Sequence, residues 1–150
     1  MGSGLDRVDT VNIVDDAVTA AKLSASLNAL ISVVGGFSIG DDGDGTASGG
    51  FNLRGPDGTT VTERFLCRAW VADAEFSEPD AQTAFTVTTG EQMRVIEANA
   101  DLEIITDNSG AVAVSIDTGI APDATKSIWV MVEVNGRIYS SGEIAVTNPA

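Results

Sequence analysis

The sequence contains no histidine and a single cysteine, Cys67. Without histidine the chain cannot form a Ser-His-Asp or Cys-His catalytic group, a His-rich zinc site or a histidine pH switch. One cysteine excludes an intrachain disulfide and leaves the redox compartment undetermined. Glycine-rich phosphate loops and Walker patterns are also missing. We therefore expect no catalytic residue and no cofactor.

Positive charge is scarce, because 8 Lys and Arg stand against 22 Asp and Glu, for a formal net charge of −14. Such a field repels phosphate backbones and anionic lipid headgroups, so nucleic acid and membranes are not expected partners. The acidic surface is either a solvated face that prevents non-specific association or a face that docks onto a basic patch.

Long apolar runs are absent as well. No segment approaches the roughly 20 apolar residues of a membrane span, and the N-terminal residues lack the apolar core of a secretory signal. Aromatic residues make up only 5% of the chain, which leaves little material for a sugar-binding platform beside paired carboxylates. We expect a soluble, non-enzymatic protein.

Apolar residues, at 43% of 150 residues, are sufficient for one core. From about residue 48 short apolar runs alternate with turn formers, and Asn135-Gly136 is the preferred dipeptide of a type I′ hairpin. Seven or eight such runs predict a mainly β protein, an immunoglobulin-like antiparallel β-sandwich with a short N-terminal helix. The expected strands are Phe51–Arg54, Val61–Ala72, Ala84–Thr88, Met93–Ala98, Leu102–Thr106, Ala111–Ile116, Ser127–Val134 and Arg137–Val146.

Alternation within the expected strands predicts which side chains face the core. Cys67 shares a face with Ala69 and Val71, so we interpret it as a small core residue rather than a nucleophile. In the strand near the C-terminus four apolar residues from Ile128 to Val134 share the core face. Trp129 and Met131 lie on the other face, where either the chain itself or a partner covers them, and they are a possible second interface.

The acidic run DDGDG at residues 41–45 has some features of a calcium loop. Asp41, Asp42 and Asp44 could supply carboxylate ligands, but a loop beginning at Asp41 would need a glutamate where Asn52 stands. We interpret the run as a flexible acidic loop, with these three aspartates as weak candidates for a cation site.

Residues 13–34 carry the only helical pattern, which Gly35-Gly36 ends. Acidic residues at its start suit the helix dipole, and an apolar seam with spacings of 3 and 4 follows. A helix of about 30 Å is marginal in water and needs a partner. That partner is either the β domain or copies of the same helix, and the width of the apolar stripe favours copies. The seam, our expected oligomer interface, consists of Ala20, Leu23, Leu27, Leu30 and Val34.

These patterns divide the chain into three parts. Residues 1–36 form an arm and helix for oligomerisation or anchoring, residues 37–47 a Gly/Asp-rich linker, and residues 48–150 the β-sandwich domain.

Residues 13–23, IVDDAVTAAKL, resemble segments near the start of trimeric fibre and head-decoration proteins of tailed bacteriophages. The runs RFLCRAWV at 64–71, ITDNSGAV at 105–112 and WVMVEVNGRIY at 129–139 are similar to immunoglobulin-like modules of phage virion proteins. The resemblance implies a homotrimeric virion component, made in the host cytoplasm and located on the exterior of the capsid. Its partners would be further copies of itself and the major capsid protein or another virion protein.

The short chain has no shaft repeats, which favours a capsid decoration or cement protein that stabilises the head shell. The alternative is a head or tail fibre module that binds a host surface glycan or protein.

Overall fold

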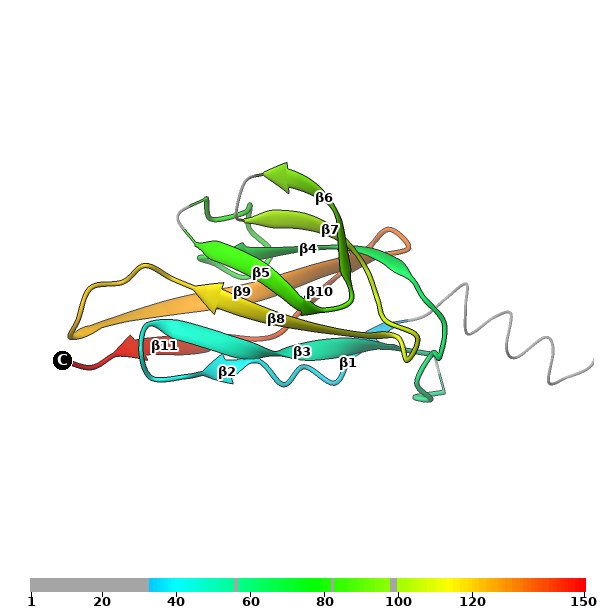
Figure 1. The fold of residues 1–150 in the computed structure, drawn as a ribbon, viewed down its shortest axis with the longest axis horizontal. Helices are drawn as coiled ribbons and strands as arrows, with labels where there is room; N and C mark the ends of the chain where they lie inside the picture. Colours follow the sequence, from blue (N-terminus) through cyan, green and yellow to red (C-terminus); the bar gives the residue numbers. More distant parts are fainter. Residues whose placement is uncertain (1–32, 56, 82, 98–99) are drawn as a thin grey trace, which may run out of the picture.

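The computed structural model describes residues 33–55, 57–81, 83–97 and 100–150. In this part of the chain eleven strands form two antiparallel sheets (Figure 1), so the expected mainly β class is confirmed. The strands are β1 (Val33–Gly35), β2 (Gly40–Asp41), β3 (Thr46–Arg54), β4 (Leu66–Ala72), β5 (Ala84–Thr89), β6 (Glu91–Glu97), β7 (Asp101–Ile105), β8 (Ala111–Asp117), β9 (Ala124–Val134), β10 (Arg137–Ser140) and β11 (Ile144–Asn148).

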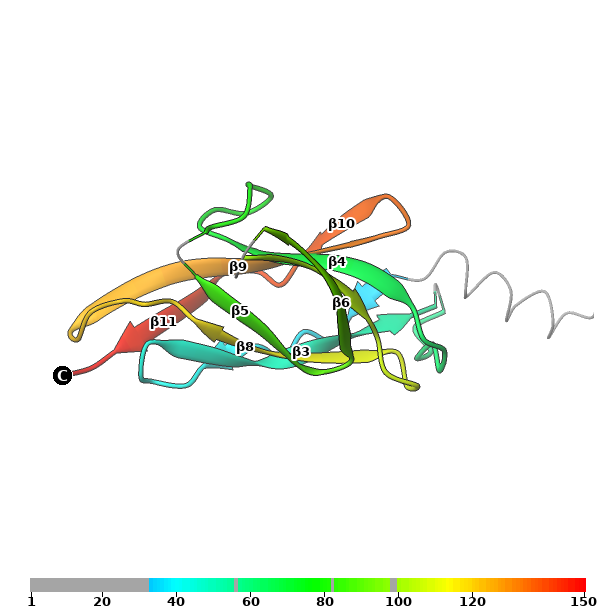
Figure 2. The same ribbon diagram turned by 45° about the horizontal axis from the view of Figure 1, so that its top comes forward.

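The two sheets pack face to face, as the turned view in Figure 2 shows. Sheet A has the order β1-β3-β8-β5, and β2 shares the edge of β3 with β1. Sheet B has the order β10-β9-β4-β7-β6, and β11 shares the edge of β9 with β10. On one side of the sandwich β11 therefore lies against β2, whereas on the other side the chain crosses between the sheets at Gly90, from β5 to β6.

The core lies between the sheets and is made mostly of β-branched and other aliphatic side chains, with the phenylalanines Phe51 and Phe85 among them. The apolar face of β9 from Ile128 to Val134 and the β4 residues Cys67, Ala69 and Val71 are buried there, as their alternation predicts. They meet β3 and β8 residues from sheet A, among them Leu53 and Ile116. Because side chains alternate along each strand, the residues between these core positions point outward, away from the other sheet.

The β9–β10 hairpin is built as predicted. Val134 pairs with Arg137, and Asn135 and Gly136 have φ values of 52° and 77°. Positive φ at both central positions is what a type I′ turn requires, and asparagine and glycine adopt it at low cost.

Aspartates that begin turns account for part of the strong acidity. In five turns an aspartate side chain accepts a hydrogen bond from the backbone N–H two residues later. These carboxylates thus have a structural use at the strand ends. The five are Asp41, Asp44, Asp57, Asp107 and Asp117.

The segment expected to end the helix and form the linker belongs instead to sheet A. Val33 and Val34 lie in β1, where Val34 pairs with Leu53 and is buried in the core. Val34 is therefore part of the sandwich, and its assignment to an oligomer seam is corrected. The expected linker 37–47 contains β2 and the start of β3, and Ser38 N donates to Gly50 O at 2.9 Å.

Some strand boundaries also differ from expectation, for local reasons. The expected strand Val61–Ala72 begins only at Leu66, and the expected strand Arg137–Val146 is divided into β10 and β11 around Gly142, whose φ is 80°. β3 begins at Thr46, earlier than the expected Phe51. Its first half shows no apolar alternation in the sequence, because it contains Gly49 and Gly50. A Cβ at Gly49 would lie 2.3 Å from the Ser38 carbonyl oxygen, so close passage of the preceding segment requires glycine there.

The expected N-terminal helix lies outside the described residues, except for its last positions. The part of the chain that the structure describes contains no α-helix, and hence no helix that could cross a membrane.

Candidate functional site

Large exposed apolar side chains gather on one sheet. Of the six among the described residues, five lie on strands of sheet B and one in the loop after β4. At the matching positions the outer face of sheet A carries small polar residues, such as the paired row Ser48, Ser115 and Thr86. The five sheet B residues, called the apolar patch below, are Leu66, Met93, Val95, Ile96 and Ile138.

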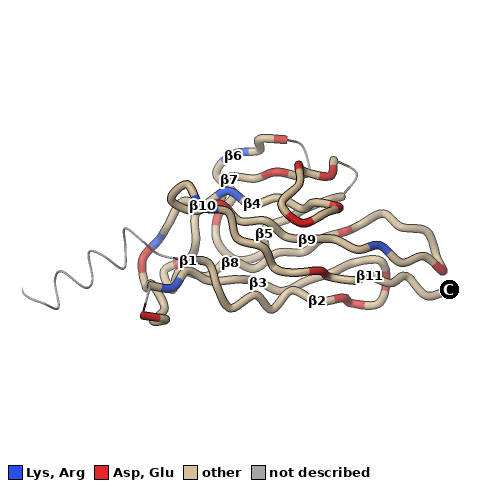
Figure 3. The backbone as a smooth tube through the Cα atoms, turned by 180° about the vertical axis from the view of Figure 1, so that it is seen from behind, with Lys and Arg blue, Asp and Glu red and all other residues tan. Residues whose placement is uncertain are grey.

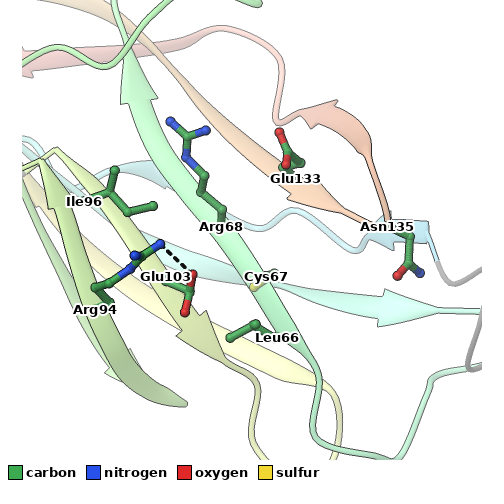
Figure 4. A pocket seen from close by; sticks show the side chains of 8 residues that line it. All are labelled: Leu66, Cys67, Arg68, Arg94, Ile96, Glu103, Glu133 and Asn135. Atoms are coloured by element: carbon green, nitrogen blue, oxygen red, sulfur yellow. Dashed lines mark hydrogen bonds and ion pairs between the residues drawn. The ribbon is translucent and has the colours of Figure 1, made fainter.

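An open groove of about 410 Å³ runs across the outer face of sheet B (Figure 4). β4 crosses its middle, β6 and β7 form one side, and the end of β9 forms the other. Apolar side chains from the patch alternate here with charged ones. The lining residues are Leu66, Cys67, Arg68, Arg94, Ile96, Glu103, Glu133 and Asn135.

Four charged residues stand side by side in this groove with alternating sign. The strand register places Arg94 opposite Glu103, Glu103 opposite Arg68, and Arg68 opposite Glu133. Arg94 Nη2 donates to Glu103 Oε2 at 3.2 Å. Opposite charges on neighbouring strands stabilise the pairing, and together the four sum to zero. This charged row by itself is thus neutral, in a chain whose net charge is −14.

Arg68 is the anchored member of the charged row. Its Nε donates to Asp101 Oδ1 at 3.0 Å and its Nη2 to Asp101 Oδ2 at 2.6 Å, and its guanidinium carbon lies 4.8 Å from the centroid of the Trp70 ring. Asp101 is buried, and its hydrogen bonds hold the pKa of the Arg68 guanidinium above its ordinary value. Arg68 is therefore a fixed positive charge at the centre of the groove.

The far end of the same face is covered by the chain itself. Trp70, Ala72 and Met131 form a small second cluster, with Trp129 packed against it. The loop after β4 contacts this cluster at Trp70, whose Nε1 donates to the Ser77 carbonyl oxygen at 2.9 Å. Met131 is completely buried, so it is not open to a partner; this corrects its expected role in a second interface, while Trp129 remains half-buried.

β6, the edge strand of sheet B, is exposed along all seven residues. Its register with β7 shifts at two bulges, and Glu91 at its start forms an ion pair with Arg64 at 2.7 Å. Bulges and charges on an edge strand oppose the addition of another strand. The apolar residues of β6 are thus suited to side-chain contacts rather than to sheet extension.

The candidate cation ligands hold a turn and a neighbouring strand. Asp41 accepts hydrogen bonds from the Thr147 hydroxyl at 2.6 Å and the Thr147 N–H at 3.1 Å, and this lowers its pKa. Asp42 and Asp44 both accept from the Thr46 hydroxyl. Among the residues that the structure describes, no cluster of three or more potential ligands could hold a metal ion.

Cys67 forms part of the groove floor but is buried, and burial raises the pKa of its thiol to about 12. The thiol therefore stays protonated at neutral pH. Its predicted role as a core residue is confirmed by its packing with the β-sandwich core.

The predicted seam and the groove lie in different parts of the chain. Ala20, Leu23, Leu27 and Leu30 fall outside the described residues, so the seam that they form stays a prediction. The charged row was not predicted, because its four members come from four strands whose spatial order the sequence does not show. A local signal did exist for the loop after β4, where the run DAEFSEPD places one phenylalanine among four acids.

The chain matches no protein-family model, no curated protein and no solved structure.

Proposed function

We propose that this chain is a non-enzymatic structural protein of a tailed bacteriophage, a capsid decoration protein that binds the outside of the head shell. The observation that carries the proposal is the one-sided distribution of exposed apolar side chains, five of which lie on sheet B. The similarity of residues 13–23 to phage fibre and head-decoration segments supplies the class of particle.

The outer face of sheet B suits contact with a protein shell. Three members of its apolar patch lie on this face, since Leu66 and Ile96 line the groove and Ile138 pairs with Glu133, and they supply area whose removal from water stabilises a complex. The charges of its charged row are paired with one another across the strands. Binding of such a surface across neighbouring shell subunits stabilises only the assembled shell, by mass action.

The homotrimer belongs to the same proposal and depends on the N-terminal segment. With Val34 in the sandwich, the seam comprises Ala20, Leu23, Leu27 and Leu30, and Leu30 precedes the start of β1 at Val33 by less than one helical turn. Leu27→Asp should lower the mass measured by light scattering to that of a monomer while the β-sheet circular dichroism is unchanged, since a charge is costly only in a packed seam.

An immunoglobulin-like topology is also part of the proposal. The spatial orders β1-β3-β8-β5 and β10-β9-β4-β7-β6 parallel those of a variable-type immunoglobulin sandwich, which supports the likeness. The connectivity differs between β4 and β8, because β5 of sheet A comes earlier in the chain than β6 and β7 of sheet B.

A binding experiment with particles tests the function. Particles from a phage deleted for the gene should take up the purified chain at a fixed ratio to the major shell protein and resist heat disruption better afterwards. Leu66→Asp and Ile96→Asp place a charge in the apolar patch and should each weaken uptake about tenfold or more.

Thr86→Asp is the matched control, because it adds the same charge to the exposed outer face of sheet A and should leave uptake unchanged. Failure of the wild-type chain to bind particles would refute the proposal. Adsorption to host cells or their surface glycans without uptake by the shell would instead support a fibre module.

A further inference from the structure

The sixth exposed apolar side chain belongs to Phe76, in the loop between β4 and β5. It is 61% exposed, the highest value among the large apolar residues that the structure describes. Its φ is 57°, in the left-handed region that phenylalanine rarely adopts. Strained residues of this kind persist only where the surrounding structure holds them, and they are concentrated at functional sites.

The loop is held firmly around Phe76. On one side Trp70 Nε1 donates to the Ser77 carbonyl oxygen, and Ser77 N and Oγ both bond to the Ala74 carbonyl oxygen at 3.2 Å and 2.8 Å. On the other side Asp80 N donates to the Val71 carbonyl oxygen at 2.7 Å. The backbone on both sides of Phe76 is thus held by hydrogen bonds, so little conformational entropy is lost when a partner binds its side chain.

The charges near Phe76 indicate the chemistry of its partner. Asp73, Glu75 and Glu78 are exposed, and none of them takes part in an ion pair among the described residues, whereas Asp80 is paired with Lys126. Residues 73–81 contain four acids and no lysine or arginine, and Figure 3 colours acidic positions red and basic positions blue along the backbone. An aromatic side chain surrounded by unpaired acids complements an apolar socket bordered by basic residues.

We propose that Phe76 inserts into an apolar socket bordered by lysine or arginine on the phage shell protein, as a second contact beside the groove of sheet B. This inference rests on the proposed function, because it assigns the partner to the same particle. To the proposed function this inference adds Phe76 as an anchor residue and a positive charge on the shell protein around the socket. The strained backbone is explained, since relaxing φ would withdraw the side chain from the socket.

Particles deleted for the gene, with purified variants of the full chain, provide the test. Phe76→Gly removes the side chain and suits a positive φ, so uptake should fall about tenfold or more while the melting temperature stays unchanged or rises. Glu75→Gln should weaken uptake several-fold and reduce its dependence on salt. Asp123→Asn, the control, also removes one exposed negative charge, at a positive φ that asparagine tolerates, and should bind like wild type.

The possible failures are distinct. If the wild-type chain binds particles and Phe76→Gly binds within twofold of it, the socket is refuted and the proposed function stands. A weaker uptake accompanied by a lower melting temperature would assign Phe76 a structural role and also refute the socket. Uptake that improves with Glu75→Gln would show that the shell border is not basic. If the wild-type chain does not bind, both proposals fail.

Discussion

The ion pair of Arg68 and Asp101 should respond unequally to loss of either partner. The Asp101 side chain is 2% exposed, whereas that of Arg68 is 39% exposed. Arg68→Met keeps an unbranched apolar side chain of similar length but leaves the buried Asp101 carboxylate without its cation. Removing one partner of a buried pair typically costs about 3–5 kcal/mol, and we expect a loss in this range.

Asp101→Asn instead leaves the Arg68 guanidinium without its carboxylate partner. This guanidinium already reaches water, and Arg68 pairs with Glu103 and Glu133 in the strand register. Solvent and these carboxylates compensate for most of the lost partner, so the expected cost is about 1–2 kcal/mol. The predicted difference between the two variants is thus roughly 2 kcal/mol, a large share of the roughly 5–15 kcal/mol by which a domain is stable.

Urea unfolding at pH 7 measures both free energies of unfolding by linear extrapolation, with the fluorescence of Trp70 and Trp129 as the signal. Arg94→Met is the matched control, because the Arg94 side chain is 67% exposed in its pair with Glu103 and its loss should cost less than about 1 kcal/mol. The reasoning is refuted if Asp101→Asn destabilises as much as Arg68→Met, since water would then reach the Asp101 carboxylate.

Three further predictions concern other parts of the fold. Hydrogen bonds from Thr147 lower the pKa of Asp41 in the folded protein. The stabilisation by its carboxylate is therefore complete above the ordinary pKa of 3.8 and is lost as the pH falls through the folded value. In urea unfolding, the difference in free energy of unfolding between wild type and Asp41→Asn should shrink below pH 3.8. Gly110→Ala should prevent folding or lower the melting temperature strongly, because its Cβ would lie 2.1 Å from the Val61 carbonyl oxygen at a φ of 71°, and wild-type-like melting would contradict this. Cys67, buried with a thiol pKa of about 12, should react with iodoacetamide at neutral pH only after unfolding, and rapid native labelling would show that the groove opens to it.

Local chemistry accounts for the features that were predicted correctly. The Asn135-Gly136 turn, the core face of β9 and the burial of Cys67 depend on residues next to one another in the chain. A two-residue turn with two positive φ values has few suitable sequences, and alternation along one strand states which side chains share a face.

Features that depend on strand neighbours were not predictable. β1 and β2 are too short to show a pattern, and their residues Val34 and Asp41 are placed by pairing with β3 and by contact with β11. The sequence likewise indicated a second layer over Trp129 and Met131 but not its source; Met131 is buried in a cluster with Trp70 and Ala72, and the loop after β4 contacts that cluster at Trp70.

The sequence by itself determined a mainly β chain with a strong negative charge, one buried thiol and its main hairpin, because composition and short-range alternation specify these properties. Only the tertiary structure decided where the outward positions meet. Arg94 and Glu103 lie on consecutive strands, whereas Arg68 and Glu133 come from distant parts of the chain, and the four form one row because β6, β7, β4 and β9 are neighbours in sheet B. Register across strands is a non-local property, set by the packing of the whole core.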